Sequence, residues 1–439
     1  MYAAPEPPAT PIYKAYDLTS RVYFAKDVMA YRGLPLVLQW SALIISSCSA
    51  ITRPDENPDI HLKTPDLVRK YGYTLEVHEV TTEDGYNLQL HRIPYGRRNS
   101  YDVLGSRSIS GSRHPILLQH GLAGSSADWV LMGPGRSLAY LLADQGYDVW
   151  LGNNRGNIYS ANHSHLATTD RAFWNFSFHE LGVYDLPAMI EYILEETGRE
   201  KIIYTGHSQG ATQFYVMCSE IPDYNSKITL MIGLAPAAFT GNIRGPVTTL
   251  AKLTYFGVWV GETFGYPEFG KRSAWGKIVS NLFCQSAAPT QFVCSNILFS
   301  IAGFSHDELD RDNLTVIIGH VPAGASWKQL VHFGQGYINP DHFRQFDYGQ
   351  PRRNLKAYNS FIPPEYQLNK IVAPVALFSS ENDPLATTKD VEILKSKLAN
   401  VILDYQVPTK TFNHYDFLWG KTSTEMVFVP MLQLLAQYG

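Results

Sequence analysis

The stretch that decides the fold is Ile202-Ile-Tyr-Thr-Gly206-His-Ser208-Gln-Gly210-Ala211. It joins a short apolar run to a G-x-S-x-G motif and continues into a segment that suits a helix. In that setting the motif predicts a nucleophile elbow, a sharp turn that exposes a serine at the carboxyl end of a buried strand. Gly206 and Gly210 remove side chains that would clash in such a turn, so Ser208 is the candidate nucleophile. The alternative is an ordinary turn with an idle serine, because the motif alone arises by chance in roughly one chain in ten of this length.

Short apolar runs alternate with helix-length stretches on both sides of this motif. Each run is apolar throughout, which suits a strand whose two faces are both covered by helices. The sequence therefore predicts an α/β fold with a mostly parallel sheet. The expected strands are Ile116–Leu118, Tyr147–Leu151, Ile202–Tyr204, Ile228–Leu234, Val375–Phe378 and Val401–Tyr405, and the expected helices are Tyr184–Thr197, Gln209–Glu220 and Thr388–Leu398. A hairpin that turns at Asp84 and Gly85 is expected before them.

The alternation stops between residues 238 and 368, in a segment rich in aromatic residues and glycine. A structureless loop of that length would be unusual in a compact domain, so we expect a mainly helical cap or lid inserted into the core. The core itself is expected at 51–237 and 369–439. Trp259, Phe264, Tyr266, Phe269 and Trp275 suit a cover for an apolar chain, although any cap core would contain such residues.

The first 50 residues are expected to be a leader with a secretory signal. Its apolar part lies in residues 34–50. The apolar run from Leu34 to Ile45 is interrupted by Gln39 and, at about 12 residues, is too short to span a bilayer, since a spanning helix needs roughly 20 apolar residues. Small residues around Cys48 resemble a signal-peptidase site, and a start at Met29 would supply a short basic segment ahead of the apolar run. The alternative is a buried helix of a cytosolic protein. If the protein is secreted, the glycosylation candidates are Asn162, Asn175 and Asn313.

Composition narrows the classes of function further. The chain has 439 residues and a formal net charge of −4, with no basic stripe, so nucleic acid is not an expected partner. Four cysteines are too few for a scaffold built on disulfides. Cys218 falls in a predicted helix and is expected to be a buried thiol, whereas Cys284 and Cys294 form the candidate local disulfide.

A serine nucleophile needs a base and an orienting carboxylate, and on a sheet of this type they follow in the order serine, acid, histidine. Asp383 stands in a loop directly after an expected strand, with Glu381 as the second candidate. His414 follows the last expected strand and is the candidate base. A surface or core role is the alternative for a single histidine.

The chemistry also needs N–H donors aimed at a developing oxyanion. The backbone N–H of Gln209, at the start of a predicted helix, is one candidate, since such groups lack a partner within the helix. The N–H of Leu122, in the loop that begins His120-Gly121, is the other. The alternative for this loop is a plain turn between strand and helix.

Three weaker signals compete with this interpretation. Residues 265–272 come close to a phosphate-binding loop, but Arg272 replaces the serine or threonine that would bind magnesium. His163 and His165 suggest a metal pair, although no further ligands cluster near them in the sequence. His207, inside the elbow, is expected to be a packing and hydrogen-bonding neighbour. No metal or cofactor is therefore expected.

Four segments together resemble the acid lipase family of gastric and lysosomal lipases, over nearly the whole chain after Asn57. They are residues 120–129 (HGLAGSSADW), 146–157 (GYDVWLGNNRGN), 206–210 (GHSQG) and 413–417 (NHYDF). The resemblance implies an α/β-hydrolase fold with a cap and lid, a Ser208, Asp383 and His414 triad, oxyanion donors at Leu122 and Gln209, and a Cys284–Cys294 cap disulfide. It also implies neutral-lipid substrates and often an acidic working pH. Ala123 departs from the family's more usual leucine, and the long leader has no family counterpart.

The expected function is that of a secreted or lysosomal ester hydrolase. It would cleave triacylglycerols or cholesteryl esters at a lipid–water interface through an acyl-serine intermediate. The alternatives are a carboxylesterase for shorter soluble esters and a non-catalytic lipid carrier.

Overall fold

The computed structural model describes residues 57–97, 113–270, 303, 305 and 307–438. The expected leader, including Met29 and Cys48, and the expected Cys284–Cys294 disulfide lie outside these residues. Within the described ranges, every helix is too short or too polar to cross a bilayer.

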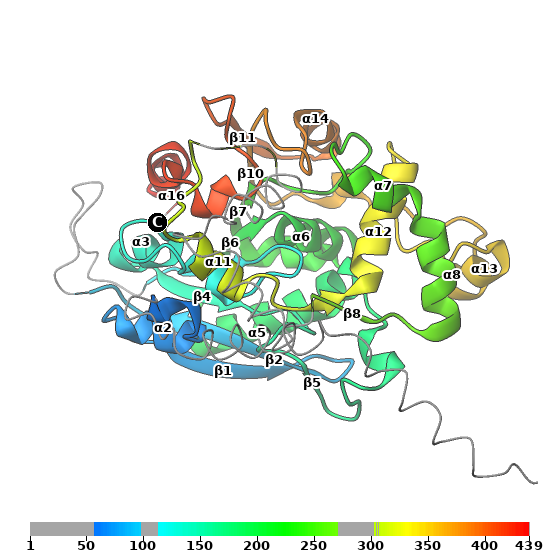
Figure 1. The fold of residues 1–439 in the computed structure, drawn as a ribbon, viewed down its shortest axis with the longest axis horizontal. Helices are drawn as coiled ribbons and strands as arrows, with labels where there is room; N and C mark the ends of the chain where they lie inside the picture. The colour runs from blue at the N-terminus through cyan, green and yellow to red at the C-terminus, as the bar shows by residue number, and fades with distance from the viewer. Residues whose placement is uncertain (1–56, 98–112, 271–302, 304, 306, 439) are drawn as a thin grey trace, which may run out of the picture. The chain divides into compact units, whose positions relative to one another are not determined.

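The central sheet has nine strands, in the order β1-β2-β4-β3-β6-β7-β10-β11, with β5 paired to β2 (Figure 1). The six strands β4, β3, β6, β7, β10 and β11 are parallel to one another, whereas β1, β2 and β5 join the sheet by antiparallel pairing. The strands are β1 Glu76–Thr81, β2 Tyr86–Ile93, β3 Pro115–Gln119, β4 Asp148–Gly152, β5 Asn162–His163, β6 Ile202–His207, β7 Ile228–Leu234, β10 Val375–Ser379 and β11 Val401–Gln406. The predicted mostly parallel α/β sheet is therefore confirmed.

Two apolar cores lie on opposite faces of this sheet. In β3, Ile116 and Leu118 belong to one core and Leu117 to the other, as the two-residue period of a strand requires. Because both faces are buried, the strand is apolar at successive positions. This is the physical reason that short continuous apolar runs located the central strands in the sequence.

Helices cover each face. The first core includes residues of α2 Thr64–Lys70, α3 Leu138–Asp144, α11 Leu314–His320, α15 Asp416–Trp419 and α16 Val429–Leu435. The second includes residues of α4 Phe178–Glu180, α5 Leu186–Thr197, α6 Gln209–Glu220 and α14 Thr388–Lys397. Short 3-10 or π turns are Pro58–Ile60, Ser126–Trp129, Arg171–Trp174, Leu181–Asp185, Pro222–Lys227, Leu368–Lys370 and Thr424–Phe428.

The described part of the segment between β7 and β10 is mostly helical. It contains α7 Val247–Lys252, α8 Thr254–Phe264, α11, α12 Trp327–Ile338 and α13 Pro351–Tyr358, and β8 Glu268–Phe269 pairs with β9 Ala325–Ser326 in a separate sheet. Helix α12 packs against α7 and α8. A small core of Val258, Tyr266, Val331 and Phe346 joins these elements. Of the aromatic residues expected to cover an apolar chain, Tyr266 is therefore a core residue, whereas Trp259 and Phe264 are exposed.

Two sequence predictions need correction. We predicted Val401–Tyr405 as a strand covered on both faces, but β11 is the edge of the sheet and alternates between half-buried and exposed positions. The helix predicted to begin at Tyr184 begins at Leu186, because residues 181–185 form a π turn. The side chain of Asp185 in that turn is engaged by a buried arginine, described below. The predicted hairpin is present, with Gly85 at a φ of 94° in its turn.

Candidate active site

Ser208 stands between β6 and α6 in a strained backbone conformation, with φ 52° and ψ −116°. Few residues other than glycine adopt a positive φ, and such strain is often found at functional sites. The Ser208 N–H donates to the carbonyl of Leu234 on β7 over 2.9 Å, which holds the turn in place. The side chain is only partly buried, although the residues on both sides of it are buried. The turn thus has the geometry that the elbow motif predicts.

Gly206 and Gly210 explain how the chain can turn so sharply. A Cβ on Gly206 would lie 2.5 Å from the backbone nitrogen of Ala211, within the same turn. A Cβ on Gly210 would lie 2.2 Å from the carbonyl oxygen of Gln119, at the end of β3. Both distances are far below van der Waals contact, so the backbones can approach this closely only with glycine at both positions.

A buried acid and histidine lie at the same edge of the sheet. Asp383 follows β10, His414 follows β11, and the His414 Nδ1–Asp383 Oδ2 distance is 2.7 Å. The second carboxylate oxygen of Asp383 accepts hydrogen bonds from the N–H groups of Leu385 and Ala386, each at 2.8 Å. This arrangement places the ring proton on Nδ1 and leaves Nε2 of His414 as an acceptor. Glu381, the second candidate acid, is exposed.

His207 connects the elbow to the histidine loop. Its Nε2 donates to the carbonyl oxygen of His414 over 3.0 Å, and the two ring centroids are 4.9 Å apart. Burial lowers the pKa of His207 to about 3, so the ring is neutral over the ordinary pH range. The elbow and His414 are thus brought together through the residue that precedes the serine.

The loop after β3 lies against the elbow. Strands β3 and β6 pair with Gln119 opposite Gly206, which places the residues that follow each strand side by side. A Cβ on Gly121 would lie 3.3 Å from the Ser208 Cβ. The Gly124 N–H donates to the Gly121 carbonyl over 3.2 Å and closes a tight turn with Leu122 inside it. Both predicted donors, the N–H groups of Leu122 and Gln209, therefore belong to segments that border Ser208.

His120 fixes the start of this loop. Its Nδ1 donates to the carbonyl of Gly121 over 2.7 Å, and its Nε2 accepts from the N–H of Asn154 over 3.1 Å. Since a backbone N–H can only donate, Nε2 must be unprotonated and the proton lies on Nδ1. Burial lowers the pKa of His120 to about 4, which keeps the ring in this neutral form.

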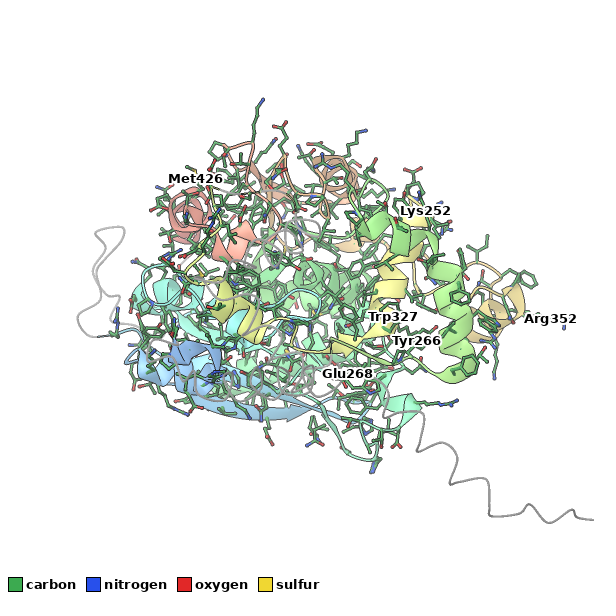
Figure 2. All side chains as sticks on the ribbon, viewed as in Figure 1. Lys252, Tyr266, Glu268, Trp327, Arg352 and Met426 are labelled. Carbon is green, nitrogen blue, oxygen red and sulfur yellow. The ribbon has the colours of Figure 1, made fainter. Side chains whose placement is uncertain are left out.

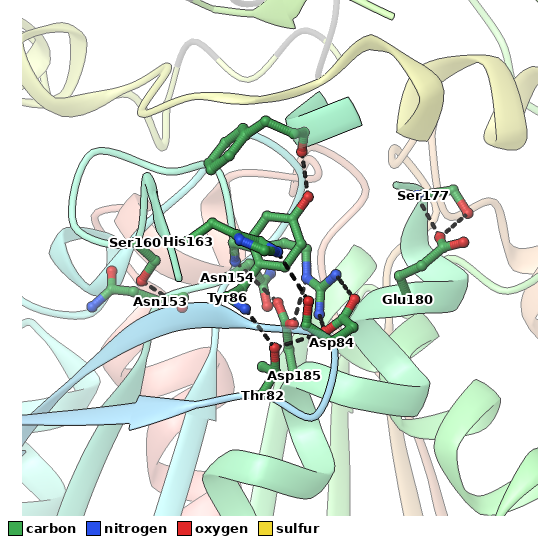
Figure 3. Close-up of polar contacts among 12 residues, drawn as sticks. Thr82, Asp84, Tyr86, Asn153, Asn154, Ser160, His163, Ser177, Glu180 and Asp185 are labelled. Carbon is green, nitrogen blue, oxygen red and sulfur yellow. Dashed lines mark hydrogen bonds and ion pairs between the residues drawn. The ribbon is translucent and has the colours of Figure 1, made fainter. Parts of the chain in front are cut away.

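The loop after β4, whose Asn154 N–H bonds His120, also holds a buried arginine to which the sequence analysis assigned no role. Arg155 forms ion pairs with Asp185 at 2.6 Å and with Asp84 at 2.5 Å, and its guanidinium lies 3.9 Å from the Tyr86 ring centroid. Figure 3 shows these partners, Asp84, Tyr86 and Asp185, close to one another. Burial opposes the charge, but Asp185 and Asp84 outweigh that effect and raise the pKa of Arg155. Arg155 lowers the pKa of Asp185, but burial has the larger effect and raises that pKa to about 6. In the sequence Arg155 stands between asparagines and a glycine, so no local signal indicated that it is buried.

The remaining predicted residues lie apart from this cluster. His163 has both ring nitrogens engaged by backbone groups of Asp84, His165 and Leu166. Among the described residues there is no group of three potential metal ligands. Asn162 and Asn175 are exposed, Asn313 is half-buried, and Cys218 is a buried free thiol. Lys271 and Arg272, at the end of the phosphate-loop-like stretch, lie outside the described residues.

A cleft of about 210 Å³ lies between the end of β7 and the segment 332–363. Its lining includes Ala238, Thr240, Phe333 and Phe343. Ser208, Asp383 and His414 are not part of that lining, so this cleft is separate from the candidate active site.

Comparison with known proteins identifies the class to which this fold and site belong. Residues 64–133 match the family described as a partial alpha/beta-hydrolase lipase region, and residues 114–248 match the alpha/beta hydrolase fold. The chain is 42% identical over 387 residues to Lipase 1 of Drosophila melanogaster, which covers 88% of this chain and 82% of that protein. It is 36% identical over 382 residues to the gastric triacylglycerol lipase of Bos taurus, covering 87% of this chain and 93% of that protein. The lysosomal acid lipase/cholesteryl ester hydrolase of Macaca fascicularis is 34% identical over 382 residues, with 87% and 92% covered.

The chain belongs to the α/β-hydrolase lipase family that includes the gastric and lysosomal acid lipases. The family resemblance predicted from the four sequence segments is thereby confirmed.

Proposed function

We propose that this protein is a serine ester hydrolase that cleaves neutral lipid esters, such as triacylglycerols or cholesteryl esters. Its relatives are named for these two substrates. The observation that carries the proposal is the buried pair of His414 and Asp383, 2.7 Å apart, next to the strained elbow of Ser208. Two further observations support ester hydrolysis: the chain's relatives are lipases, and its candidate site has the residue types that this reaction requires.

In the first half of the reaction, Ser208 Oγ attacks the ester carbonyl carbon while Nε2 of His414 takes the hydroxyl proton. Asp383 accepts the Nδ1–H of His414, which fixes the tautomer and stabilises the imidazolium that forms. The N–H groups of Leu122 and Gln209 donate to the oxyanion of the tetrahedral intermediate, and each such donor is worth roughly 3 to 4 kcal/mol in the transition state. His414 then protonates the leaving alcohol oxygen, and an acyl-serine remains.

In the second half, water attacks the acyl carbon and gives its proton to His414. Collapse of the second tetrahedral intermediate releases the fatty acid and returns the proton to Ser208. No cofactor or metal ion takes part in these steps. The chain supplies the nucleophile, the base, the orienting acid and the two donors.

The setting of the reaction is also part of the proposal. Residues 238–368 would act as a cap and lid over the acyl chain, and the protein would be secreted or lysosomal, as the names of its gastric and lysosomal relatives suggest. Secretion would make Asn162, Asn175 and Asn313 sites of glycosylation and would allow a disulfide between Cys284 and Cys294.

Labelling with a fluorophosphonate probe tests the nucleophile. The wild-type protein should be labelled, Ser208→Ala should not, and Ser226→Ala should behave like wild type because Ser226 is an exposed surface serine. Loss of labelling in Ser208→Ala with retained thermal stability would support the proposal. An unlabelled wild-type protein that still binds lipid would instead indicate a carrier.

A profile of acyl chain length tests the substrate class. Emulsified long-chain triacylglycerol and cholesteryl ester should be turned over at least as well as soluble short-chain esters. If short soluble esters turn over far faster than every long-chain substrate, the enzyme is a carboxylesterase and the lipase proposal is wrong.

A further inference from the structure

The loop at 120–126, which carries one of the two proposed oxyanion donors, contains a residue in a strained backbone conformation. Ala123, which follows Leu122, has a φ of 57°. A side chain makes this conformation costly, and a residue other than glycine keeps it only where the surrounding structure holds the chain firmly. Neighbouring groups must therefore anchor the loop if the Leu122 N–H is to keep one direction.

The start of the loop is anchored to the segment that follows β4. His120 Nε2 accepts the N–H of Asn154 over 3.1 Å, and Gln119 Nε2 donates to the side-chain oxygen of Asn154 over 2.6 Å. Strands β3 and β4 pair in parallel, so the residues that follow them lie side by side. Gly152 leaves the room that the Gln119 side chain occupies, because a Cβ there would lie 2.0 Å from Gln119 Oε1. Asn154 thus holds the point at which the loop begins.

The end of the loop is anchored by the side chain of Asn153. Its oxygen accepts the N–H of Ser126 over 2.9 Å, and its nitrogen donates to the carbonyl oxygen of Gln89 on β2 over 3.1 Å. The side chain of Asn157 donates to the same oxygen of Asn153 over 3.0 Å. Asn153 is fully buried, so bulk water cannot replace it in these bonds. Adjacent residues of one segment therefore hold both ends of the loop.

The segment that carries these anchors is itself fixed in place. The Ser160 hydroxyl donates to the carbonyl oxygen of Asn153 over 3.0 Å, a bond drawn in Figure 3. The side-chain oxygen of Asn157 accepts the N–H groups of Tyr159 and Ser160, at 2.9 and 3.1 Å. The buried ion pairs of Arg155 hold the middle of the segment. The position of the Asn153 side chain is thus set by the fold and not by the loop that it holds.

A second segment holds the middle of the loop. The Ala323 N–H donates to the Ala123 carbonyl oxygen over 2.6 Å. Ala323 lies two residues before β9, and Figure 2 shows Glu268 of β8 and Trp327, the first residue of α12, close together where β8 and β9 pair. This bond joins two backbone groups. Asn153, by contrast, anchors the loop through its side chain, so a substitution can remove that anchor.

We propose that Asn153 is a positioning residue for the oxyanion donor Leu122, because its carboxamide fixes the end of the loop in which that N–H lies. This inference rests on the proposed function, which assigns the Leu122 N–H to the oxyanion. Asn153 acts through the loop and not on the substrate. A displaced N–H forms a weaker bond to the negative charge that develops only in the transition state. Loss of Asn153 should therefore lower kcat more than it changes KM.

Kinetics on a soluble ester test the inference, with Asn225→Ala as the matched control for Asn153→Ala. Asn225 is also buried, and its carboxamide bonds backbone groups of residues 222, 370, 372 and 373, which lie outside the loop at 120–126. Both variants lose buried hydrogen bonds of the same kind, so urea unfolding should show similar losses of stability. Asn153→Ala alone should lower kcat, by about tenfold or more, with KM within a few-fold of wild type.

A trifluoromethyl ketone tests the oxyanion site directly. Ser208 Oγ adds to its carbonyl carbon, His414 takes the serine proton, and the former carbonyl oxygen carries the negative charge. The Ki of this inhibitor should rise in Asn153→Ala by about the factor by which kcat/KM falls, and it should not change in Asn225→Ala. The pH midpoint of the acid limb of kcat/KM should stay at its wild-type value, because His414 and Asp383 keep their bond. A shift of that midpoint would mean that Asn153 acts on the base, and the inference would be wrong.

Two further variants separate the Ser126 bond from a general loss of packing. Asn153→Asp keeps an oxygen that accepts the Ser126 N–H, and in its protonated form it also donates to the Gln89 carbonyl. Its kcat at the acidic end of the activity range should be within a few-fold of wild type. In Asn153→Ser a water molecule has room beside the shorter side chain, so this variant should fold if Asn153→Ala does not, and its kcat should fall by about threefold or more.

Three results would overturn the inference. They are a wild-type kcat in the alanine and serine variants of Asn153, an equal fall of kcat in Asn225→Ala, and a kcat of Asn153→Asp as low as that of Asn153→Ala. In each of these cases the wild-type protein still hydrolyses esters, so the proposed function stands. A wild-type protein that neither hydrolyses esters nor reacts with a fluorophosphonate would instead overturn the proposed function, and this inference with it.

Discussion

His207 Nε2 donates to the carbonyl oxygen of His414 over 3.0 Å, so the residue before the candidate nucleophile holds the loop of the candidate base. The other ring nitrogen of His207 faces Gly121, where a Cβ would lie 3.1 Å away, and it has no hydrogen-bond partner among the described residues. A proton is therefore kept on Nε2, and His207 acts as a neutral donor to the base loop.

This relationship predicts different outcomes for two substitutions of His207. In His207→Gln the side-chain amide can replace the Nε2 donor, so kcat on a soluble ester should stay within a few-fold of wild type. In His207→Leu the donor is lost and kcat should fall by about tenfold or more, since small displacements of a base are costly. KM should change little in both. Equal kcat values for the two variants would contradict a role for this hydrogen bond.

Asp383→Asn should lower kcat by about four orders of magnitude if Asp383 acts as proposed. The amide would retain the size of the side chain but would favour the wrong tautomer of His414. The measurement is kcat on a soluble ester, with circular dichroism to show that the fold is retained. Glu381→Gln is the control and should be close to wild type, because Glu381 is exposed.

Gly210→Ala should destabilise the elbow severely. The added Cβ would lie 2.2 Å from a backbone oxygen of Gln119, so β3 and α6 would have to separate. We expect a loss of several kcal/mol, measured by urea unfolding. Gly257→Ala is the comparison, because its Cβ would meet side chains and no backbone atom: the end of Val331 at 3.1 Å and Trp327 Nε1 at 3.8 Å. A similar loss in the two variants would contradict this account of the elbow.

Arg155→Met should destabilise the fold by roughly 3 to 5 kcal/mol, because the buried carboxylate of Asp185 loses its partner. Arg155 is 1% exposed, whereas Arg136, which pairs with Asp310, is 36% exposed. Arg136→Met should therefore cost about 1 kcal/mol or less. Urea unfolding of both variants gives the comparison, and equal losses would show that burial does not decide the effect.

Asp128 predicts a specific pH dependence of stability. Burial raises the pKa of Asp128 from its usual value of 3.8 to about 7. The folded state then binds more protons than the unfolded state between these values, so this group's contribution is present below about pH 4 and is lost as pH rises to about 7. Asp128→Asn cannot titrate. Urea unfolding of both proteins across pH measures the effect. The free energy of unfolding of the wild type, relative to that of the variant, should fall between about pH 4 and 7 by at most about 4 kcal/mol. A difference that stays constant with pH would contradict this prediction.

The sequence predicted the candidate triad from the position of each member in a segment that follows a strand of the parallel sheet. Parallel strands end at one edge, so the segments after β6, β10 and β11 meet there: His414 bonds Asp383, and His207, next to Ser208, bonds the His414 carbonyl. The glycines of the elbow and the apolar runs are local signals of that arrangement. The strand at 401–406 was less well predicted, since an edge strand does not need apolar residues on both faces.

The residues that support the site from outside could not be predicted in the same way. Arg155 pairs with Asp84 and Asp185, which are 71 and 30 residues away and belong to no common motif. An isolated arginine is usually a surface residue, and only the packing around it shows otherwise. The exposure of the Trp259 and Phe264 rings could not be predicted either. Composition does not distinguish the buried side of a helical segment from its exposed side.

Strands β7 and β10 are hydrogen-bonded neighbours, with Met231 opposite Val375, although the whole segment with α7, α8, α12 and α13 separates them in the chain. The chain thus leaves and re-enters the sheet at points about one strand spacing apart, roughly 4.8 Å. Such closely spaced ends let that segment be lengthened, shortened or exchanged as a module without shifting the register of the strands before Ser208 and Asp383. A graft of the corresponding segment from another lipase could therefore change substrate preference while the catalytic chemistry is inherited unchanged.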